Sequence, residues 1–233
     1  MTQNEAALEE HLVQIPAQSR QLEGILRLPR SALGVVAFAH GSGSGRHSPR
    51  NRFVAGVLNQ AGIGTLLLDL LGEEEAEDRA RVFDIELLAA RLQCATDWLL
   101  RAPETRGLPR GYFGASTGAA AALYAAARKT DSVTAIVSRG GRPDLAEGAL
   151  PAVTAPTLLI VGGDDDAVID LNRQAFARLR CLKEMVIIPH ATHLFPEPGA
   201  LEEVAKLATQ WFVRFLRAPS ASRRREAPGA IHP

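Results

Sequence analysis

One short stretch limits the folds open to this chain: Gly114-x-Ser116-x-Gly118, with alanines at 119–122 behind it. The β-favouring pair Tyr112–Phe113 precedes the stretch and a strong helix-forming run follows it, so the residues specify a strand, a turn and a helix. At such a turn the serine is held in a strained conformation, and side chains two positions before and after it would collide. Glycine removes that collision, and the pattern therefore predicts a nucleophile at Ser116.

The rest of the chain alternates apolar strand runs with helical periodicity. Strands are predicted at 34–39, 65–69, 110–115, 133–138, 156–162 and 184–189, and helices at 51–60, 82–101, 117–128, 171–179 and 200–216. Residues 11–15 and 21–28 favour an antiparallel edge hairpin, and residues 71–81 a charged loop. The sequence thus predicts one α/β domain over residues 1–216, with a mostly parallel sheet and helices on both faces. Residues 217–233 are expected to form a disordered tail.

The charge balance and the hydropathy of the chain limit which classes of binding partner and which cellular location are expected. Lys plus Arg and Asp plus Glu both number 26, so no basic surface is forced on the protein and nucleic acid is not expected as a partner. No apolar run approaches the roughly 18 residues of a membrane span, and residues 1–10 lack a signal pattern. We expect a cytoplasmic protein without a membrane partner. Cys94 and Cys181 are expected to be free thiols rather than a disulfide.

A serine hydroxyl needs a base, and the base is usually a histidine held by a carboxylate. Ligands of open parallel sheets bind at the carboxyl ends of the strands, so the partners of Ser116 should follow strands. His193 follows the last predicted strand, and we predict that it is the base, with His190 as the alternative.

The carboxylate is expected after the strand that ends at Gly162. Three acids follow it, Asp164–Asp166, and repulsion keeps all three from pointing inward. The spacing G-x-x-D selects Asp165, with Asp166 as the alternative, and Asp170 is interpreted as the cap of the next helix. The resulting order of serine, aspartate and histidine is the one expected of hydrolases built on this turn.

Acyl transfer builds negative charge on a carbonyl oxygen, and two backbone N–H groups are predicted to stabilise it. One is the N–H of Thr117, next after the serine. The other comes from the glycine-rich loop after the strand at 34–39, where we predict Ser42, with Gly41 as the alternative. A dinucleotide-binding reading of this loop fails, because Arg46 stands where the third glycine should be.

Four features together resemble the α/β-hydrolase fold: His40–Gly41, the serine turn, Gly162–Asp165 and His193. Over roughly residues 11–216 the chain most resembles the dienelactone hydrolase-like group. The resemblance implies a sheet of eight strands or close to it, and hydrolysis of small esters, thioesters or lactones without a metal or organic cofactor. Dienelactone hydrolases proper use a cysteine where this chain has Ser116. The short segment between residues 138 and 156 leaves no room for a large lid, so an open site is expected.

Arg139 and Arg142 leave the carboxyl end of a predicted strand. One of them is expected to contact an anionic substrate group, the alternative being a structural pair with Asp144 or with the acids at 164–166. The main functional prediction is a serine hydrolase acting on a small-molecule ester, as a monomer or homodimer. The alternatives are an acyltransferase or perhydrolase with the same three side chains, and a non-catalytic relative that binds a ligand.

Overall fold

The computed structural model describes residues 8–18 and 20–216, so the predicted tail at 217–233 lies outside the described residues. Eight strands form one sheet in the order β1-β2-β4-β3-β5-β6-β7-β8. The strands are β1 (Glu9–Ala17), β2 (Arg20–Leu28), β3 (Val35–Ala39), β4 (Gly64–Leu68), β5 (Arg110–Ala115), β6 (Ala135–Arg139), β7 (Thr157–Gly162) and β8 (Lys183–Ile188). Six of them are parallel neighbours, and β1 and β2 form the predicted antiparallel hairpin. The predicted mostly parallel α/β sheet is confirmed.

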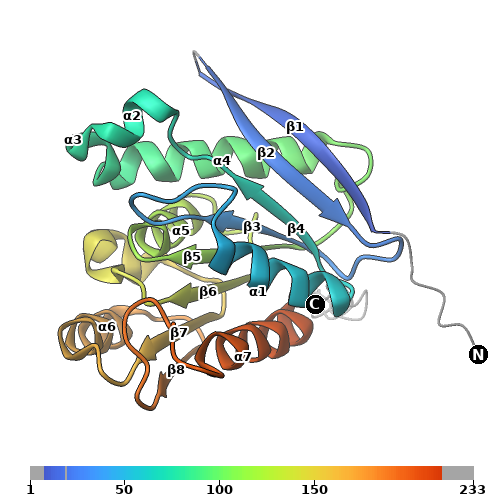
Figure 1. The fold of residues 1–233 in the computed structure, drawn as a ribbon. Coiled ribbons are helices and arrows are strands. Elements are labelled where there is room, and N and C mark those ends of the chain that lie inside the picture. Colours follow the sequence, from blue (N-terminus) through green and yellow to red (C-terminus); the bar gives the residue numbers. More distant parts are fainter. Residues whose placement is uncertain (1–7, 19, 217–233) are drawn as a thin grey trace, which may run out of the picture.

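Helices cover both faces of the sheet, as the alternating pattern predicts. On one face α1 (Pro49–Gln60) and α7 (Ala200–Phe215) enclose a core with one side of β3, β5 and β6. On the other, α4 (Ile85–Arg101), α5 (Thr117–Arg128) and α6 (Asp166–Arg178) enclose a second core. Figure 1 shows α1 and α7 on the near face, and β5 and β6 pointing to the left. The central strands β3 and β4 are wholly buried, which is why their sequences are continuously apolar.

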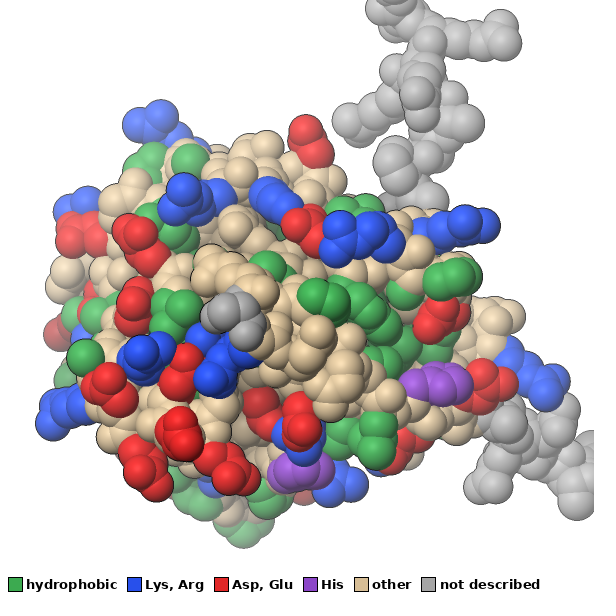
Figure 2. Space-filling view, turned by 90° about the horizontal axis from the view of Figure 1, so that it is seen from above, with side chains coloured by type: hydrophobic (Ala, Val, Ile, Leu, Met, Phe, Trp, Pro, Cys, Tyr) green, Lys and Arg blue, Asp and Glu red, His purple; other side chains and the backbone are tan. Residues whose placement is uncertain are grey.

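The segment predicted as a charged loop, residues 71–81, is helical instead. It forms α2 (Glu73–Glu77) and α3 (Arg79–Val82). Glu75 is only 8% exposed, and it accepts two hydrogen bonds from Arg91 at 2.7 Å each, one from Arg20 at 2.6 Å and one from Arg81 at 2.9 Å. These ion pairs reach across 55, 6 and 16 residues, so local periodicity could not reveal the helix. Figure 2 looks down on this side of the molecule, where acidic and basic side chains are interspersed.

Two further boundaries differ from the prediction or refine it. Helix α6 begins at Asp166, so Asp170 lies inside the helix, is exposed and pairs with Arg173 at 3.1 Å. The interpretation of Asp170 as a cap was therefore wrong. The segment after β6 forms only a short 3-10 helix, η1 (Pro143–Ala152). Among the described helices, none combines the length and apolar character that crossing a lipid bilayer requires.

Candidate active site

Ser116 sits on a strained turn between β5 and α5. Its backbone angles are φ 50° and ψ −122°, a region that residues other than glycine rarely adopt. A Cβ on Gly114 would lie 2.4 Å from the Cα of Ala119, and one on Gly118 would lie 2.1 Å from the carbonyl oxygen of Ala39 in β3. The two glycines are thus required by the close approach of α5 to the sheet, as the sequence pattern predicts.

His193 and Asp165 meet on two neighbouring loops, after β8 and β7. The distance from His193 Nδ1 to Asp165 Oδ2 is 2.7 Å, and the Asp165 side chain is 16% exposed against 38% for His193. The loops touch closely, because a Cβ on Gly162 would lie 2.3 Å from the carbonyl oxygen of Ala191. The side chain that orients an imidazole is therefore in place.

The alternatives considered for these two positions face solvent. His190 and Asp166 are exposed, and within the described part of the chain neither side chain makes a hydrogen bond. The loop that carries His193 is bracketed by positive φ angles at His190 (58°) and Phe195 (56°). Backbone strain is thus gathered at this end of the sheet, where functional sites commonly hold it.

Ser116 and His193 both border the end of β6. The N–H of Ser116 donates to the carbonyl oxygen of Arg139 at 3.4 Å, and a Cβ on Gly140 would lie 3.6 Å from the ring atom Cε1 of His193. Among the described residues no hydrogen bond joins Ser116 Oγ to the imidazole. Such bonds are often long before substrate binds, and tighten only in the reacting complex.

The two predicted oxyanion donors line one small cavity of about 10 Å³. Within the described residues, neither the N–H of Thr117 nor that of Ser42 donates to a protein acceptor. The loop reaches the nucleophile closely, because a Cβ on Gly41 would lie 2.9 Å from the Cβ of Ser116. Two free N–H groups beside a serine can stabilise a developing oxyanion.

His40 orients this loop, a role that the sequence interpretation missed. His40 Nε2 accepts the N–H of Leu70 at 2.9 Å, so Nδ1 carries the proton and donates to the carbonyl oxygen of Gly41, also at 2.9 Å. Because C=O and N–H of a trans peptide point in opposite directions, this bond turns the N–H of Ser42 away from His40. Burial lowers the pKa of His40 and keeps the imidazole neutral. The signal available in the sequence was a polar residue ending a fully buried strand.

The two arginines after β6 have different surroundings. Arg142 Nε and Nη2 bind both carboxylate oxygens of Asp144, at 2.9 and 2.7 Å, which is the structural alternative considered above. Arg139 is buried, and among the described residues no carboxylate pairs with it. The Arg139 guanidinium carbon instead lies 5.9 Å from the ring centroid of Phe195.

An apolar wall stands beside the oxyanion donors. The small cavity is lined on its far side by Leu71, Ala76, Val82 and Leu88, from the α2–α3 segment and α4. A larger open cavity of about 710 Å³ adjoins it and shares Leu71 and Ala76. In the described ranges, no group of three or more His, Cys, Asp or Glu side chains is arranged to hold a metal ion.

Several proteins of solved structure share this fold. A dienelactone hydrolase from Anabaena variabilis is 57% identical, with a TM-score of 0.87 over 90% of this chain and 99% of that one. A dienelactone hydrolase-like promiscuous phosphotriesterase from metagenomic libraries is 20% identical, with a TM-score of 0.73 over 90% and 99% of the two chains. Est1E from Butyrivibrio proteoclasticus, at 16% identity and a TM-score of 0.72 over 87% and 98%, shares the fold.

Comparison with curated proteins adds a longer relative. Two Mycobacterium tuberculosis proteins named "Putative phosphoribosyl transferase" are 56% identical over 215 residues, which cover 92% of this chain and 48% of theirs. The chain thus spans about half the length of the curated relatives it matches. No family model matches the chain. The 57% identity to the Anabaena enzyme extends over nearly the whole of both chains, and on that ground this chain belongs to the dienelactone hydrolase family of α/β hydrolases.

Proposed function

We propose that this chain is a serine hydrolase that cleaves small carboxylic esters, thioesters or lactones through an acyl-enzyme on Ser116. The observation that carries the proposal is the 2.7 Å hydrogen bond between His193 and Asp165, on loops that border the strained serine turn. A carboxylate at Nδ1 fixes the tautomer of the imidazole and leaves Nε2 free to accept a proton. A protein that only binds a ligand has no need of this arrangement.

The reaction proceeds in two halves. Ser116 Oγ attacks the substrate carbonyl carbon while His193 Nε2 takes the hydroxyl proton, and the N–H groups of Thr117 and Ser42 stabilise the oxyanion. His193 then returns the proton to the departing alcohol or thiol as the C–O or C–S bond breaks. A water molecule, deprotonated by His193, attacks the acyl carbon, and His193 returns that proton to Ser116 Oγ as the ester bond to the serine breaks and the acid leaves. Asp165 stays ionised throughout and stabilises the imidazolium.

The surroundings of the oxyanion donors favour a short acyl group. The cavity of about 10 Å³ beside Ser42 and Thr117 has an apolar wall and space for at most about one water molecule. The neighbouring open cavity of about 710 Å³, which shares Ser44, Leu71 and Ala76 with the small one, offers room for a bulkier leaving group. The curated M. tuberculosis relatives are about twice as long as this chain, and we assign ester hydrolysis to the region shared with it.

Labelling with a fluorophosphonate probe tests the nucleophile, and a panel of p-nitrophenyl esters of increasing chain length, with one lactone and one thioester, tests the substrate class. Ser116→Ala is expected to abolish labelling and to lower kcat at least a thousandfold. Ser31→Ala, at an exposed serine outside the site, is the matched control and should retain both. Labelling that persists in Ser116→Ala would refute the assignment. Product analysis with a competing alcohol or peroxide separates hydrolysis from acyl transfer and perhydrolysis.

A further inference from the structure

Arg139 carries a buried positive charge that nothing in the described protein neutralises. The residue is 6% exposed, and its Nε and Nη1 atoms are enclosed without a hydrogen-bond partner. Burial, and secondarily the nearby charge of Arg50, lowers the pKa of Arg139 to about 10, so the group remains a cation at neutral pH. An uncompensated buried charge destabilises the fold, and an anion bound beside it would offset that cost.

Arg50 places a second cation beside the first. Its Nε is also enclosed and unpartnered, and its charge is close enough to depress the pKa of Arg139. Arg50 lies in the first turn of α1, which contains no acidic residue. A helix N-terminus carries a partial positive charge, so a cation there is unfavourable unless an anion sits beside it.

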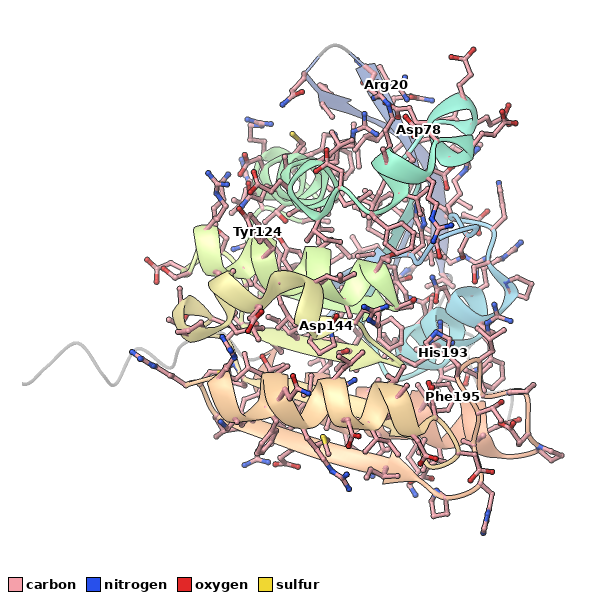
Figure 3. The ribbon with its side chains drawn as sticks, turned by 90° about the vertical axis from the view of Figure 1, so that its left-hand side faces the viewer. Arg20, Asp78, Tyr124, Asp144, His193 and Phe195 are labelled. Atoms are coloured by element: carbon pink, nitrogen blue, oxygen red, sulfur yellow. The ribbon has the colours of Figure 1, made fainter. Side chains whose placement is uncertain are left out.

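The pair lies next to the proposed catalytic residues. Side chains alternate along a strand, so Arg139 shares with Val137 the face covered by α1 and α7. The Arg139 guanidinium contacts the ring of Phe195, two residues after His193. Figure 3 shows His193 and Phe195 close together. Arg139 thus lies against the histidine loop, on the side of the helix α1 that carries Arg50.

We propose that Arg50 and Arg139 bind the phosphate group of a substrate that carries a phosphate monoester. The proposal rests on the hydrolase function given above and names its substrate class. Two guanidinium groups supply two positive charges and at least three enclosed N–H donors. A phosphate monoester carries close to two negative charges and three acceptor oxygens at neutral pH, whereas a carboxylate offers one charge and two oxygens. Arg142 is excluded from this role, because Asp144 occupies its fork.

Binding of phenyl phosphate, measured by calorimetry and by the shift in Tm, tests the site apart from catalysis. Wild type and Ser116→Ala are expected to bind it equally, while Arg139→Met and Arg50→Gln bind at least tenfold more weakly. Arg52→Gln, at an exposed arginine in the same helical turn, is the matched control and should change affinity by less than twofold. Benzoate, the carboxylate analogue, is expected to bind wild type at least tenfold more weakly than phenyl phosphate.

Thermal stability separates a ligand-binding arginine from a structural one. Arg139→Met removes an uncompensated buried charge, so its Tm without ligand should exceed that of wild type. A lower Tm for Arg139→Met, an unchanged phenyl phosphate affinity in both arginine variants, or tighter binding of benzoate would each overturn the proposal. If Ser116→Ala still takes up the fluorophosphonate probe while phenyl phosphate binds as described, the hydrolase assignment fails and the phosphate site stands.

Discussion

Replacing Glu75 with glutamine removes the negative charge around which three arginines gather. The hydrogen bonds from Arg91 are the largest cause that holds the pKa of Glu75 at about 2, against an ordinary value of 4.5. At about 1.4 kcal/mol per pH unit, this difference corresponds to about 3 kcal/mol of stability at neutral pH. A depressed carboxyl pKa stabilises the fold fully above pH 4.5, and the contribution is lost as pH falls toward 2. We therefore expect Glu75→Gln to lower the free energy of unfolding by about 3 kcal/mol at pH 7 and by about 1.4 kcal/mol at pH 3.

Urea unfolding followed by circular dichroism at both pH values measures this loss. Glu77→Gln, an exposed neighbour in the same helix α2, is the matched control and should change stability by less than about 0.5 kcal/mol. Glu75→Gln should also raise KM for p-nitrophenyl esters, because α2 carries Ala76 in the wall of the small cavity. Equal losses in the two variants, or a loss that does not depend on pH, would show that the arginine cluster does not stabilise the fold.

Three other substitutions address the site and its turn, and a fourth, in α1, is the control for the last of them. His40→Ala leaves two buried backbone groups unpaired and should lower kcat about 10²- to 10³-fold with little change in KM, measured by steady-state kinetics on p-nitrophenyl acetate. Asp165→Asn should lower kcat about 10⁴-fold, and retention of a tenth of the activity would argue against its orienting role. Gly118→Ala places a Cβ against Ala39 and should abolish soluble expression, whereas Gly56→Ala, where a Cβ meets nothing within 4 Å, should raise stability by about 0.5–1 kcal/mol in a thermal melt.

The sheet could be predicted from the sequence because its central strands are buried on both faces. The predicted ranges for β3, β5 and β7 agree with the structure to within one residue, since burial forces a continuous apolar run between polar or glycine-rich ends. The serine turn was also predictable, because only small residues fit where α5 meets β5. These are constraints that act within a few residues of chain.

The α2–α3 segment could not be predicted, because its order comes from distant partners. A run of three glutamates has no apolar face for periodicity to detect, and Glu75 is buried only because Arg20 and Arg91 approach from other elements. The start of α6 was missed for a related reason. Residues 164–166 suggest a polar turn, yet helix α6 begins at Asp166. The side chain of Asp165 bonds to His193 and does not cap the helix.

At the candidate site, the sequence pointed to side chains but not to their surroundings. The order of Ser116, Asp165 and His193 was expected, and their catalytic roles remain predictions. Nothing in the sequence separated Arg139 from Arg142, whereas in the structure Asp144 pairs with Arg142 and Arg139 is buried without a carboxylate partner among the described residues. Arg50 lies outside the helix predicted at 51–60, and nothing in the local sequence distinguishes it from the arginines near it.

Gly118 rests against the last carbonyl of β3, and Gly41 rests against the side chain of Ser116. The Ser116 hydroxyl and the loop that carries the oxyanion donor Ser42 are thereby packed tightly against each other and form one side of the site. The opposite wall is formed largely by the α2–α3 segment, which packs on the core through Leu71 and Val82 and is tied to Arg20 and Arg91 through the Glu75 carboxylate. Substitutions in the α2–α3 segment can reshape the site without disturbing the packing between the serine turn and the oxyanion loop. Differences in substrate among relatives should therefore concentrate in residues 71–82.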